Sequence, residues 1–470
     1  MPGTIPKWPA WPEFPSEGSN AKDTDYATAK HAVLEACDKN TLRRNWIAVC
    51  DELNEITDHI IARRSEIIPV CEASEVLRRG FTDEQVAAIK QTGCAVITDV
   101  IPEDKSQRLY SELQRYLKDN EGEIASWPKE SPSMYELYES PTQIAIRSDP
   151  NHIEIQRRLI SLWSDSTADE SSASGRLEPL AYLDGLRDRP PRQDFLGLGP
   201  HVDAGSLSRW ADPVYRDAYA AIFSRDYSTY DAWDLGVRKS AKQDLFPAAA
   251  HSGVFRSFQG WTALTPAAPR EGSLLLYPNV KAVVAYMLLR PFFKPPKTNE
   301  DATPDLDPRK WELDDNDYFP GTMKSQSQRL SRTSHPHLRL EECLVHIPPI
   351  KAGDTVWWHS DVSFARRKPP EVPRCYKLFQ RVLTVVPQLC HAVDPEHLGS
   401  QNASVVYVPA CPSTPANSAY VRQQLDNILA GRPPPDSLGR LDETTLKGYK
   451  SHEELGLGQE ARKAYGYDLA

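Results

Sequence analysis

The stretch Phe195-Leu-Gly-Leu-Gly-Pro-His-Val-Asp203 decides how this sequence is interpreted. It ends in His201 and Asp203 with one residue between them. On a β-strand, residues two apart point to the same face of the sheet. If the stretch is a strand, one imidazole and one carboxylate project together into the interior of the fold. This pair predicts half of a metal site, and a further ligand must come from elsewhere in the chain.

The sequence after Phe195 consists of short apolar runs divided by Pro, Gly and Asp. Short runs with frequent turn residues are typical of β-sandwiches and jelly rolls, rather than of strands that alternate with helices. The clearest runs are Trp261-Thr-Ala-Leu264, Ser273-Leu-Leu-Leu-Tyr277, Cys343-Leu-Val-His-Ile347, Asp354-Thr-Val-Trp-Trp358 and Ser404-Val-Val-Tyr-Val408. We therefore predict a mainly β fold with helical extensions (α+β) and a jelly-roll core.

Helical patterns flank this region. Apolar residues recur at spacings of three and four between Leu42 and Ile60, which predicts an amphipathic helix. Thr82-Asp-Glu-Gln85 resembles an N-terminal capping box. Helices are also predicted over Glu103–Leu117 and Ala419–Leu429. We expect four segments: a flexible lead over 1–25, a helical extension over 26–92, the β core over 93–412 and a helical tail over 413–470.

Composition narrows the class of protein. The 470 residues carry a formal net charge of -10, from 55 Lys and Arg against 65 Asp and Glu. Nucleic-acid binding needs clustered positive charge, and no such cluster stands out, so we expect no nucleic-acid partner.

The longest apolar run, near Val283 to Leu289, is shorter than the roughly 20 residues that cross a bilayer. The eight cysteines lack paired spacing, which favours free thiols. We expect a cytosolic protein with no membrane partner.

Two histidines are candidates for the missing ligand. His391 opens the segment His391-Ala-Val-Asp-Pro-Glu-His397, and His359 closes Lys351-Ala-Gly-Asp-Thr-Val-Trp-Trp-His359, a turn that leads into a strand. Two imidazoles and one carboxylate form the facial triad of non-haem Fe(II) oxygenases, which leaves positions on the metal open for cosubstrate and O₂. His391 is our preferred third ligand and His359 the alternative.

Several motifs in the chain are distinctive. They are Gly199-Pro-His-Val-Asp203, Tyr230-Asp-Ala-Trp-Asp-Leu-Gly-Val-Arg238, Phe258-Gln-Gly-Trp-Thr-Ala-Leu264, Tyr277-Pro-Asn279, His335-Pro-His-Leu-Arg339 and Val406-Tyr-Val-Pro-Ala410. Through these motifs the chain resembles the YbiU-like candidate dioxygenases and, more broadly, the phytanoyl-CoA-hydroxylase branch of the 2-oxoglutarate oxygenases, over roughly residues 30–460. The resemblance implies a double-stranded β-helix (jelly roll), Fe(II), 2-oxoglutarate and oxidation of an unidentified small molecule.

The chain departs from the family pattern before His391. In the family, the strand equivalent to Trp357-Trp-His-Ser-Asp361 runs almost directly into the His-Ala-Val segment, whereas here Val362 to Cys390 intervene. Removing Val362 to Gln388 restores the expected spacing. Valine codons begin with GT and Gln388 could be encoded by CAG, so we hypothesise that 362–388 is a retained intron; sequencing the transcript tests this.

A second departure concerns the cosubstrate. Arginine binds a carboxylate best because its fork matches the two oxygens. Many 2-oxoglutarate oxygenases carry this arginine on the strand after the distal histidine, but Gln401-Asn-Ala-Ser-Val-Val-Tyr407 has no basic residue. The candidate replacements are Arg256, Lys281 and Arg339, with hydroxyl groups from Ser404 and Tyr407.

Substrate contacts are expected from Arg187, Arg189, Arg209 and Trp261. Several cations near a small polar pocket would favour an anionic substrate.

Other interpretations stay open at this point. The chain could be a non-catalytic metal-binding jelly roll, or a pseudoenzyme whose triad the insertion disrupts. It could also be a cupin-type enzyme that uses the metal as a Lewis acid without an oxo acid. The sequence has no Gly-rich phosphate loop, zinc-finger spacing or dinucleotide fingerprint, which argues against ATPases, zinc-finger proteins and dehydrogenases.

Overall fold

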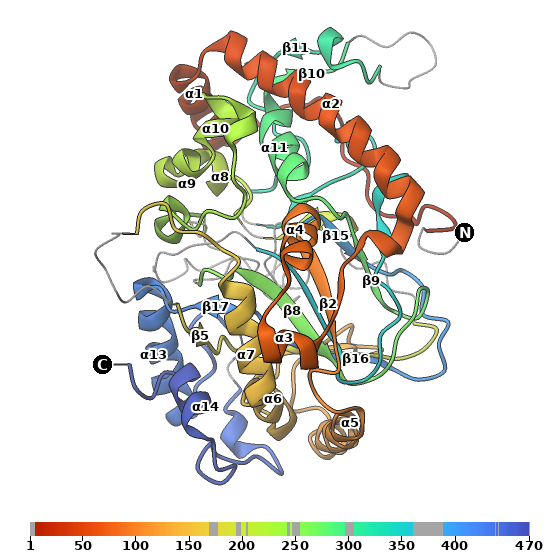
Figure 1. Cartoon of the computed structure of the whole chain (residues 1–470), viewed down its shortest axis with the longest axis vertical. Helices are drawn as coiled ribbons and strands as arrows, with labels where there is room; N and C mark the ends of the chain where they lie inside the picture. The colour runs from red at the N-terminus through yellow and green to blue at the C-terminus, as the bar shows by residue number, and fades with distance from the viewer. Residues whose placement is uncertain are drawn as a thin grey trace.

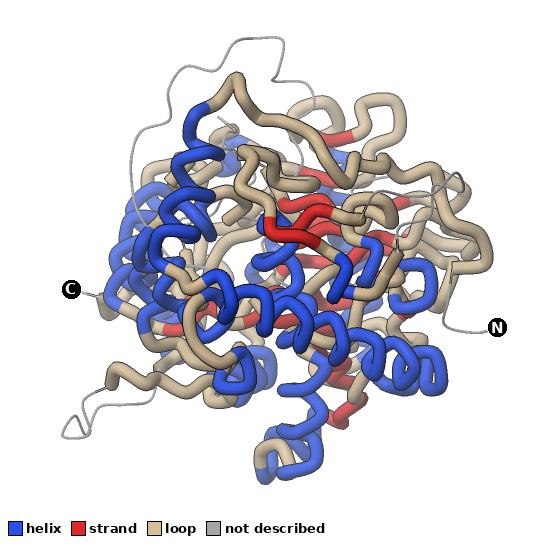
Figure 2. The backbone as a smooth tube through the Cα atoms, turned by 90° about the horizontal axis from the view of Figure 1, so that it is seen from above, coloured by secondary structure: helices blue, strands red, loops and turns tan. Residues whose placement is uncertain are grey.

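The computed structural model describes residues 5–168, 177–193, 199–203, 205–241, 245–246, 254–296, 305–324, 326–360, 389–437, 439 and 441–469. Within these ranges the fold is mixed α/β, with two large sheets at the centre and helices around them (Figures 1 and 2). The suggested insertion, 362–388, lies outside the described residues.

The larger sheet has eight strands and is antiparallel except for the pair at one edge, β1 and β2. In spatial order the strands are β1 (Val70–Glu72), β2 (Cys94–Thr98), β14 (Thr355–His359), β8 (Phe258–Ala263), β16 (Ala403–Tyr407), β6 (Leu186–Arg189), β4 (Met134–Tyr135) and β3 (Ser126–Trp127). Three of these, β8, β14 and β16, lie at runs that the sequence predicted as strands.

The smaller sheet has five antiparallel strands. Their order is β12 (Gln328–Arg329), β7 (His201–Val202), β15 (His391–Val393), β9 (Leu274–Leu276) and β13 (Val345–His346). Two further pairs of strands lie outside both sheets: β10 (Phe293–Lys294) with β11 (Glu312–Leu313), and β17 (Cys411–Pro412) with β5 (Pro179–Leu180). The predicted strand Cys343–Ile347 is shortened to β13, because its first residue ends helix α12.

Helices enclose the sheets. The N-terminal ones are α1 (Thr24–Ala36), α2 (Lys39–Arg63), α3 (Ala73–Arg79), α4 (Asp83–Thr92), α5 (Glu103–Asp119), α6 (Pro141–Arg147) and α7 (Pro150–Ile160). The others are α8 (Ser208–Ala211), α9 (Pro213–Ala218), α10 (Ala220–Phe223), α11 (Lys281–Leu289), α12 (Leu340–Cys343), α13 (Pro415–Leu429) and α14 (Gln459–Ala464). The capping box is confirmed, since the Thr82 and Gln85 side chains each bond the other's backbone N–H at the start of α4.

The apolar stripe predicted between Leu42 and Ile60 is the buried face of α2, which packs along α11 (Figure 1). Trp46 lies at its centre, with ring centroids 4.6 Å from Phe293 and 5.4 Å from Tyr286. The apolar run near Val283 to Leu289 forms α11, which is buried on all sides, as expected of a helix without a polar face.

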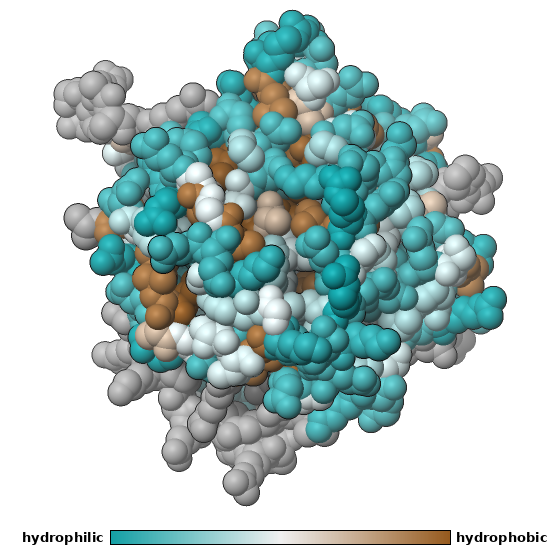
Figure 3. All heavy atoms as spheres, turned by 90° about the horizontal axis from the view of Figure 1, so that it is seen from below, coloured by the Kyte–Doolittle hydropathy of each residue, from teal (hydrophilic) through white to brown (hydrophobic). Residues whose placement is uncertain are grey.

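No helix in the described part of the chain is both long and apolar enough to span a membrane. The face seen in Figure 3 is mainly hydrophilic, with apolar side chains gathered in separate patches.

The two faces of the eight-stranded sheet have different neighbours. On one face His152 of α7 bonds Thr262 of β8 at 2.9 Å and its ring contacts Trp357. On the opposite face Trp358 contacts His391 of the smaller sheet, with ring centroids 5.6 Å apart. Side chains alternate along a strand, so the residues that share the face of Trp358 look toward the smaller sheet.

Gly260 provides the space that Trp357 occupies. The two residues lie opposite each other on β8 and β14, and a Cβ on Gly260 would come within 2.4 Å of the indole.

We expect Gly260→Ala to lower the free energy of unfolding by about 1–3 kcal/mol, the usual cost of overpacking a core. Urea unfolding followed by fluorescence measures this, with Gly458→Ala as the control because open space surrounds that glycine. An unchanged midpoint for Gly260→Ala would contradict this register.

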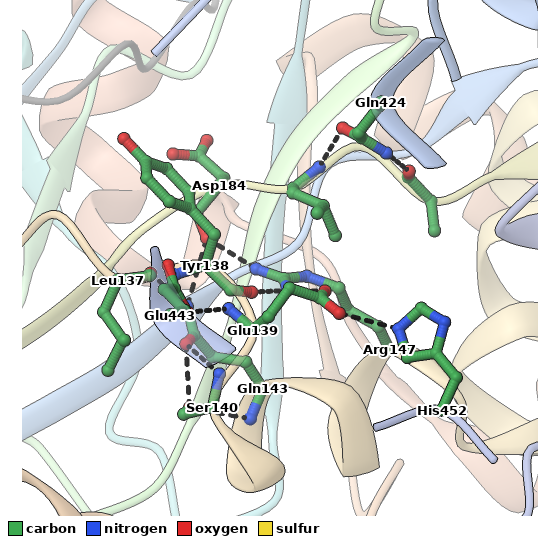
Figure 4. Close-up of polar contacts among 12 residues, drawn as sticks. Leu137, Tyr138, Glu139, Ser140, Gln143, Arg147, Asp184, Gln424, Glu443 and His452 are labelled. Carbon is green, nitrogen blue, oxygen red and sulfur yellow. Dashed lines mark hydrogen bonds and ion pairs between the residues drawn. The ribbon is translucent and has the colours of Figure 1, made fainter. Parts of the chain in front are cut away.

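A buried polar network joins the C-terminal tail to the core (Figure 4). His452 Nε2 lies 2.6 Å from Glu139 Oε2, and Arg147 donates to the backbone carbonyls of Tyr138 and Asp184. Glu443 accepts the backbone N–H groups of Tyr138 and Glu139, each at 2.8 Å. These contacts hold the segment after α13 against the start of α6.

Burial raises the pKa of Glu443 from 4.5 to about 7, the two backbone N–H bonds oppose this increase and Glu139 adds to it. The folded protein therefore binds a proton more tightly than the unfolded chain, and stability is lost as the pH rises from 4.5 through 7. We expect Glu443→Gln to make this loss smaller, by on the order of 1–2 kcal/mol. Urea unfolding at pH 5 and pH 8 measures the difference, with the exposed Glu130→Gln as the matched control.

Candidate metal centre

The centre is built on one row of side chains across the smaller sheet. His201 of β7 lies opposite Arg329 of β12 on one side and opposite His391 of β15 on the other, and His391 lies opposite Leu276 of β9. Directly opposed residues of antiparallel strands project to the same face. Because Trp358 contacts His391, this face is the one that looks toward the larger sheet. Asp203 follows β7 two residues after His201.

The three predicted ligands come together in space. His201 Nε2 is 3.1 Å from Asp203 Oδ1, and His391 Nε2 is 3.5 Å from Asp203 Oδ2. The imidazole centroids are 4.1 Å apart, and one ligand atom from each residue lies within 4.8 Å of the others. All three side chains are buried. The sequence-remote His391 therefore reaches the His-x-Asp pair despite the segment that precedes it.

Backbone carbonyls orient both imidazoles. His201 Nδ1 lies 2.7 Å from the carbonyl of Gly199, and His391 Nδ1 lies 3.0 Å from the carbonyl of Leu389. A carbonyl only accepts, so each Nδ1 carries the proton and donates it. Each Nε2 is then left with a lone pair that faces the carboxylate. Metal-binding histidines are commonly fixed in this way by the second nitrogen.

The charge states suit a metal. Burial lowers the pKa of His391 to about 3, with His201 adding to the shift and Asp203 opposing it. Burial favours the neutral form of Asp203, but His201, His391 and a hydrogen bond from Ser327 Oγ at 3.2 Å bring its pKa below the ordinary value. Asp203 Oδ2 is buried and accepts no hydrogen bond from the described residues. The neutral imidazole of His391, the second imidazole of His201 and a carboxylate with one unused oxygen form a donor set of the facial-triad type.

The N-terminal lead packs against this site. Trp11 is buried, and a Cβ placed on Gly199 would come within 2.8 Å of its indole. Gly199 supplies the carbonyl that orients His201. Phe14 N–H is also bonded to Ser331 at 3.0 Å. The lead was expected to be flexible, and its residues from Ile5 onward lie among the described ranges.

His359, the alternative ligand, lies in the larger sheet, apart from the His–Asp–His group. Its Nε2 is 2.8 Å from the carbonyl of Ala232 and therefore donates to it. Its ring stacks on Trp163, with centroids 4.7 Å apart. Burial lowers its pKa to about 3. These contacts describe a packed core histidine.

The wall opposite the centre carries three of the predicted residues. Arg187, Trp261 and Tyr407 lie in register on β6, β8 and β16, on the face that Trp358 shares. Burial raises the pKa of Tyr407, the Arg187 guanidinium opposes the increase, and Asp184 and Asp203 add to it. The phenol therefore experiences both the arginine and the candidate metal-binding carboxylate.

The other cosubstrate candidates are engaged elsewhere. Arg256 bonds Gln259 at 3.2 Å and lies 3.5 Å from the buried Asp184. Lys281 donates to the carbonyl of Ser228 at 3.2 Å, and Arg339 pairs with Glu342 at 3.0 Å. Ser404 lies on the opposite face of β16, across from Asp188. The structure does not bring these four to the triad.

Two predicted substrate residues brace the surrounding chain. Arg189 donates to the carbonyls of Asp394, Gln193 and Pro395. Arg209 donates to the carbonyl of Asp203 at 2.9 Å, which fixes the turn that follows β7.

Sequence reasoning missed Ser327 and Arg329. Both belong to the two-residue strand β12 and its entry, which is too short to give a periodic signal. Their position beside β7 follows only from the pairing of strands far apart in the sequence.

The fold and the site define a mixed α/β protein with a buried His–Asp–His candidate metal centre. The chain belongs to the Gig2-like family, whose model matches residues 21–372 and 385–466. The Escherichia coli (strain K12) protein YbiU is 28% identical over 470 residues, covering 95% of this chain and 98% of YbiU.

Solved structures show the same likeness. GlcNAc Inducible Gene 2 of Candida albicans has a TM-score of 0.75 and 25% identity, covering 94% of this chain and 89% of that one. A hypothetical protein from Escherichia coli has a TM-score of 0.74 and 26% identity, covering 98% and 99%. A candidate oxidoreductase from Salmonella typhimurium LT2 has a TM-score of 0.74 and 25% identity, also covering 98% and 99%.

We expect His391→Gln and His359→Gln to have separate effects. The first removes a donor from the centre and should weaken metal binding by more than about 100-fold, since even outer partners of a ligand contribute 10–100-fold. The second removes a buried hydrogen bond and should lower stability by about 1–3 kcal/mol while metal content stays unchanged. Metal analysis after dialysis, paired with thermal unfolding, distinguishes them. If only the His359 variant lost metal, His359 and not His391 would be the metal ligand.

Proposed function

We propose that the protein is an Fe(II)- and 2-oxoglutarate-dependent oxygenase that oxidises a small molecule with O₂. The convergence of His201, Asp203 and His391 carries this proposal. Their two imidazoles and single carboxylate match the ligand set of this enzyme class. The relative from Salmonella typhimurium LT2 that is described as a candidate oxidoreductase is consistent with redox chemistry.

The arrangement of strands supports a double-stranded β-helix. Along the chain, β7 and β9 belong to the smaller sheet, with β8 of the larger sheet between them. The pattern repeats with β14, β15 and β16, which lie in the larger, smaller and larger sheet. Antiparallel strands that cross repeatedly between two facing sheets are typical of jelly rolls. Such a fold would place the triad on the smaller sheet and the facing wall of Arg187, Trp261 and Tyr407 on the larger one.

His201, Asp203 and His391 would hold the iron. Bound Fe(II) would supply the redox chemistry by which O₂ oxidises a 2-oxo acid and the substrate. The protein's own part is orientation and exclusion of water. The carbonyls of Gly199 and Leu389 keep both Nε2 atoms directed inward. Trp261 and Trp358, both buried, supply apolar surface on the facing wall.

Arg187 is our choice for the cation that binds the far carboxylate of 2-oxoglutarate. It lies opposite Val405 of β16, the strand on which many 2-oxoglutarate oxygenases carry this arginine, so here the charge would lie on the neighbouring strand. One Nη donates to the carbonyl of Gly272 at 2.9 Å, and its buried Nε has no acceptor among the described residues. Tyr407 shares this face and would add a hydroxyl.

Anaerobic addition of Fe(II) and 2-oxoglutarate tests the proposal directly, because chelation of iron by the oxo acid gives a weak visible absorption band. The wild-type protein should develop this band, and the His391→Gln variant should not. Iron binding without a band would instead favour a metal site that uses no oxo acid.

The same titration tests Arg187. Loss of a charge-assisted hydrogen bond inside a protein costs about 1.5–3 kcal/mol, so Arg187→Gln should weaken 2-oxoglutarate binding by about tenfold or more. Arg187→Lys should recover part of it. Arg339→Gln, whose guanidinium pairs with Glu342, should bind as the wild type does. A normal affinity in the Arg187 variant and a loss in the Arg339 variant would reverse this assignment.

A further inference from the structure

The candidate centre is surrounded by more positive charge than one oxo acid requires. Arg187 faces it from the larger sheet, Arg209 holds the backbone of Asp203, and Arg329 lies beside His201. None of the three forms an ion pair with a carboxylate in the described part of the chain, and each has a buried nitrogen without an acceptor there. Asp203 is the single carboxylate within the metal group.

Arg329 occupies the most informative of these positions. It is directly opposite His201 in the β12–β7 pair, so its side chain leaves the sheet on the same face as both imidazoles. The residue as a whole is half-buried, whereas its Nε is fully buried. Burial lowers the pKa of Arg329 and the attraction of Asp203 opposes this shift, which places the guanidinium within electrostatic reach of the centre.

A cation beside a metal site is unfavourable unless an anion joins it. Burying charge without a partner costs free energy, and a guanidinium next to His201 also repels a divalent ion held there. Asp203 cannot offset Fe(II) and three arginines together. 2-Oxoglutarate on Arg187 would supply two negative charges, which still leaves the side of β12 positive.

We infer that the substrate carries an oxyanion group, a carboxylate or a phosphate, and that Arg329 binds this group beside His201. The inference rests on the proposed function, because it assigns Arg187 to the oxo acid and Arg329 to the substrate. The planar guanidinium suits either group, since its N–H donors bind carboxylate and phosphate oxygens in pairs. The anion would lie near the metal without acting as one of its ligands.

The test uses the full-length protein loaded with Co(II), with and without 2-oxoglutarate. Acetate and methylphosphonate serve as probes, because each carries one anionic group and one methyl group. Co(II) at the centre speeds the relaxation of methyl protons that bind nearby, and Zn(II)-loaded protein gives the baseline. The wild type should relax at least one probe, and the stronger effect distinguishes a carboxylate from a phosphate.

Arg329→Gln should weaken binding of the probe by about tenfold or more, and Arg329→Lys should restore part of it. The matched control is Arg332→Gln, a more exposed arginine three residues along that pairs with Glu13 and Glu341. The Arg329 variants should still hold metal and still bind 2-oxoglutarate, which shows that the site folds.

Different results separate the two proposals. Suppose that 2-oxoglutarate binds normally. If neither probe is relaxed by the wild type, or if the relaxation survives in Arg329→Gln, the anion site is overturned and the proposed function stands. Absence of 2-oxoglutarate binding, with a probe effect that still depends on Arg329, supports the anion site and overturns the proposed cosubstrate.

Discussion

The pairing of β7 with β15 is the constraint on which the centre depends. Residues 190 positions apart in the chain meet there as directly opposed neighbours, His201 against His391. Opposed residues of antiparallel strands project to one face with Cβ atoms about 4.5–5.5 Å apart, close enough for two imidazoles to share an ion. A slip of either strand by one residue would turn its imidazole to the other face. The register is therefore as important as the identity of the residues.

Several surrounding contacts fix this register from different directions. Carbonyls two residues before each histidine hold the rings, and Arg209 holds the backbone of Asp203. The larger sheet closes the other side, where Trp358 reaches His391. Trp357, its neighbour on the strand, points the opposite way into the space over Gly260. Adjacent tryptophans on β14 thus serve two layers, one facing the candidate centre and one facing α7.

Local signals in the sequence predicted the parts of the structure that depend on local physics. The His-x-Asp spacing follows from the period of a strand and the apolar stripe of α2 from the period of a helix. The capping box at Thr82 follows from side-chain bonds within one turn. Helices α6 and α7 were missed, although Ser140-Pro-Thr-Gln143 and Asp149-Pro150 are readable N-terminal signals. Arg329 could not be found in this way, because its role comes from a strand pairing that no short-range pattern encodes. The expected cosubstrate cations failed to reach the triad for the same reason: a neighbour in a sheet need not be a neighbour in sequence.

Trp11 gives the N-terminal lead an influence that its position in the chain does not suggest. Its indole covers Gly199, and the carbonyl of that glycine holds the proton of His201. Proteolytic removal of the N-terminal residues through Trp11 would therefore weaken the hydrogen bond that holds His201 Nδ1. The metal-facing atoms of the three ligands would still be present. The affinity of the centre for its ion is in this sense coupled to the integrity of a segment about two hundred residues upstream, and a protein clipped near its start would be expected to lose metal before it lost its fold.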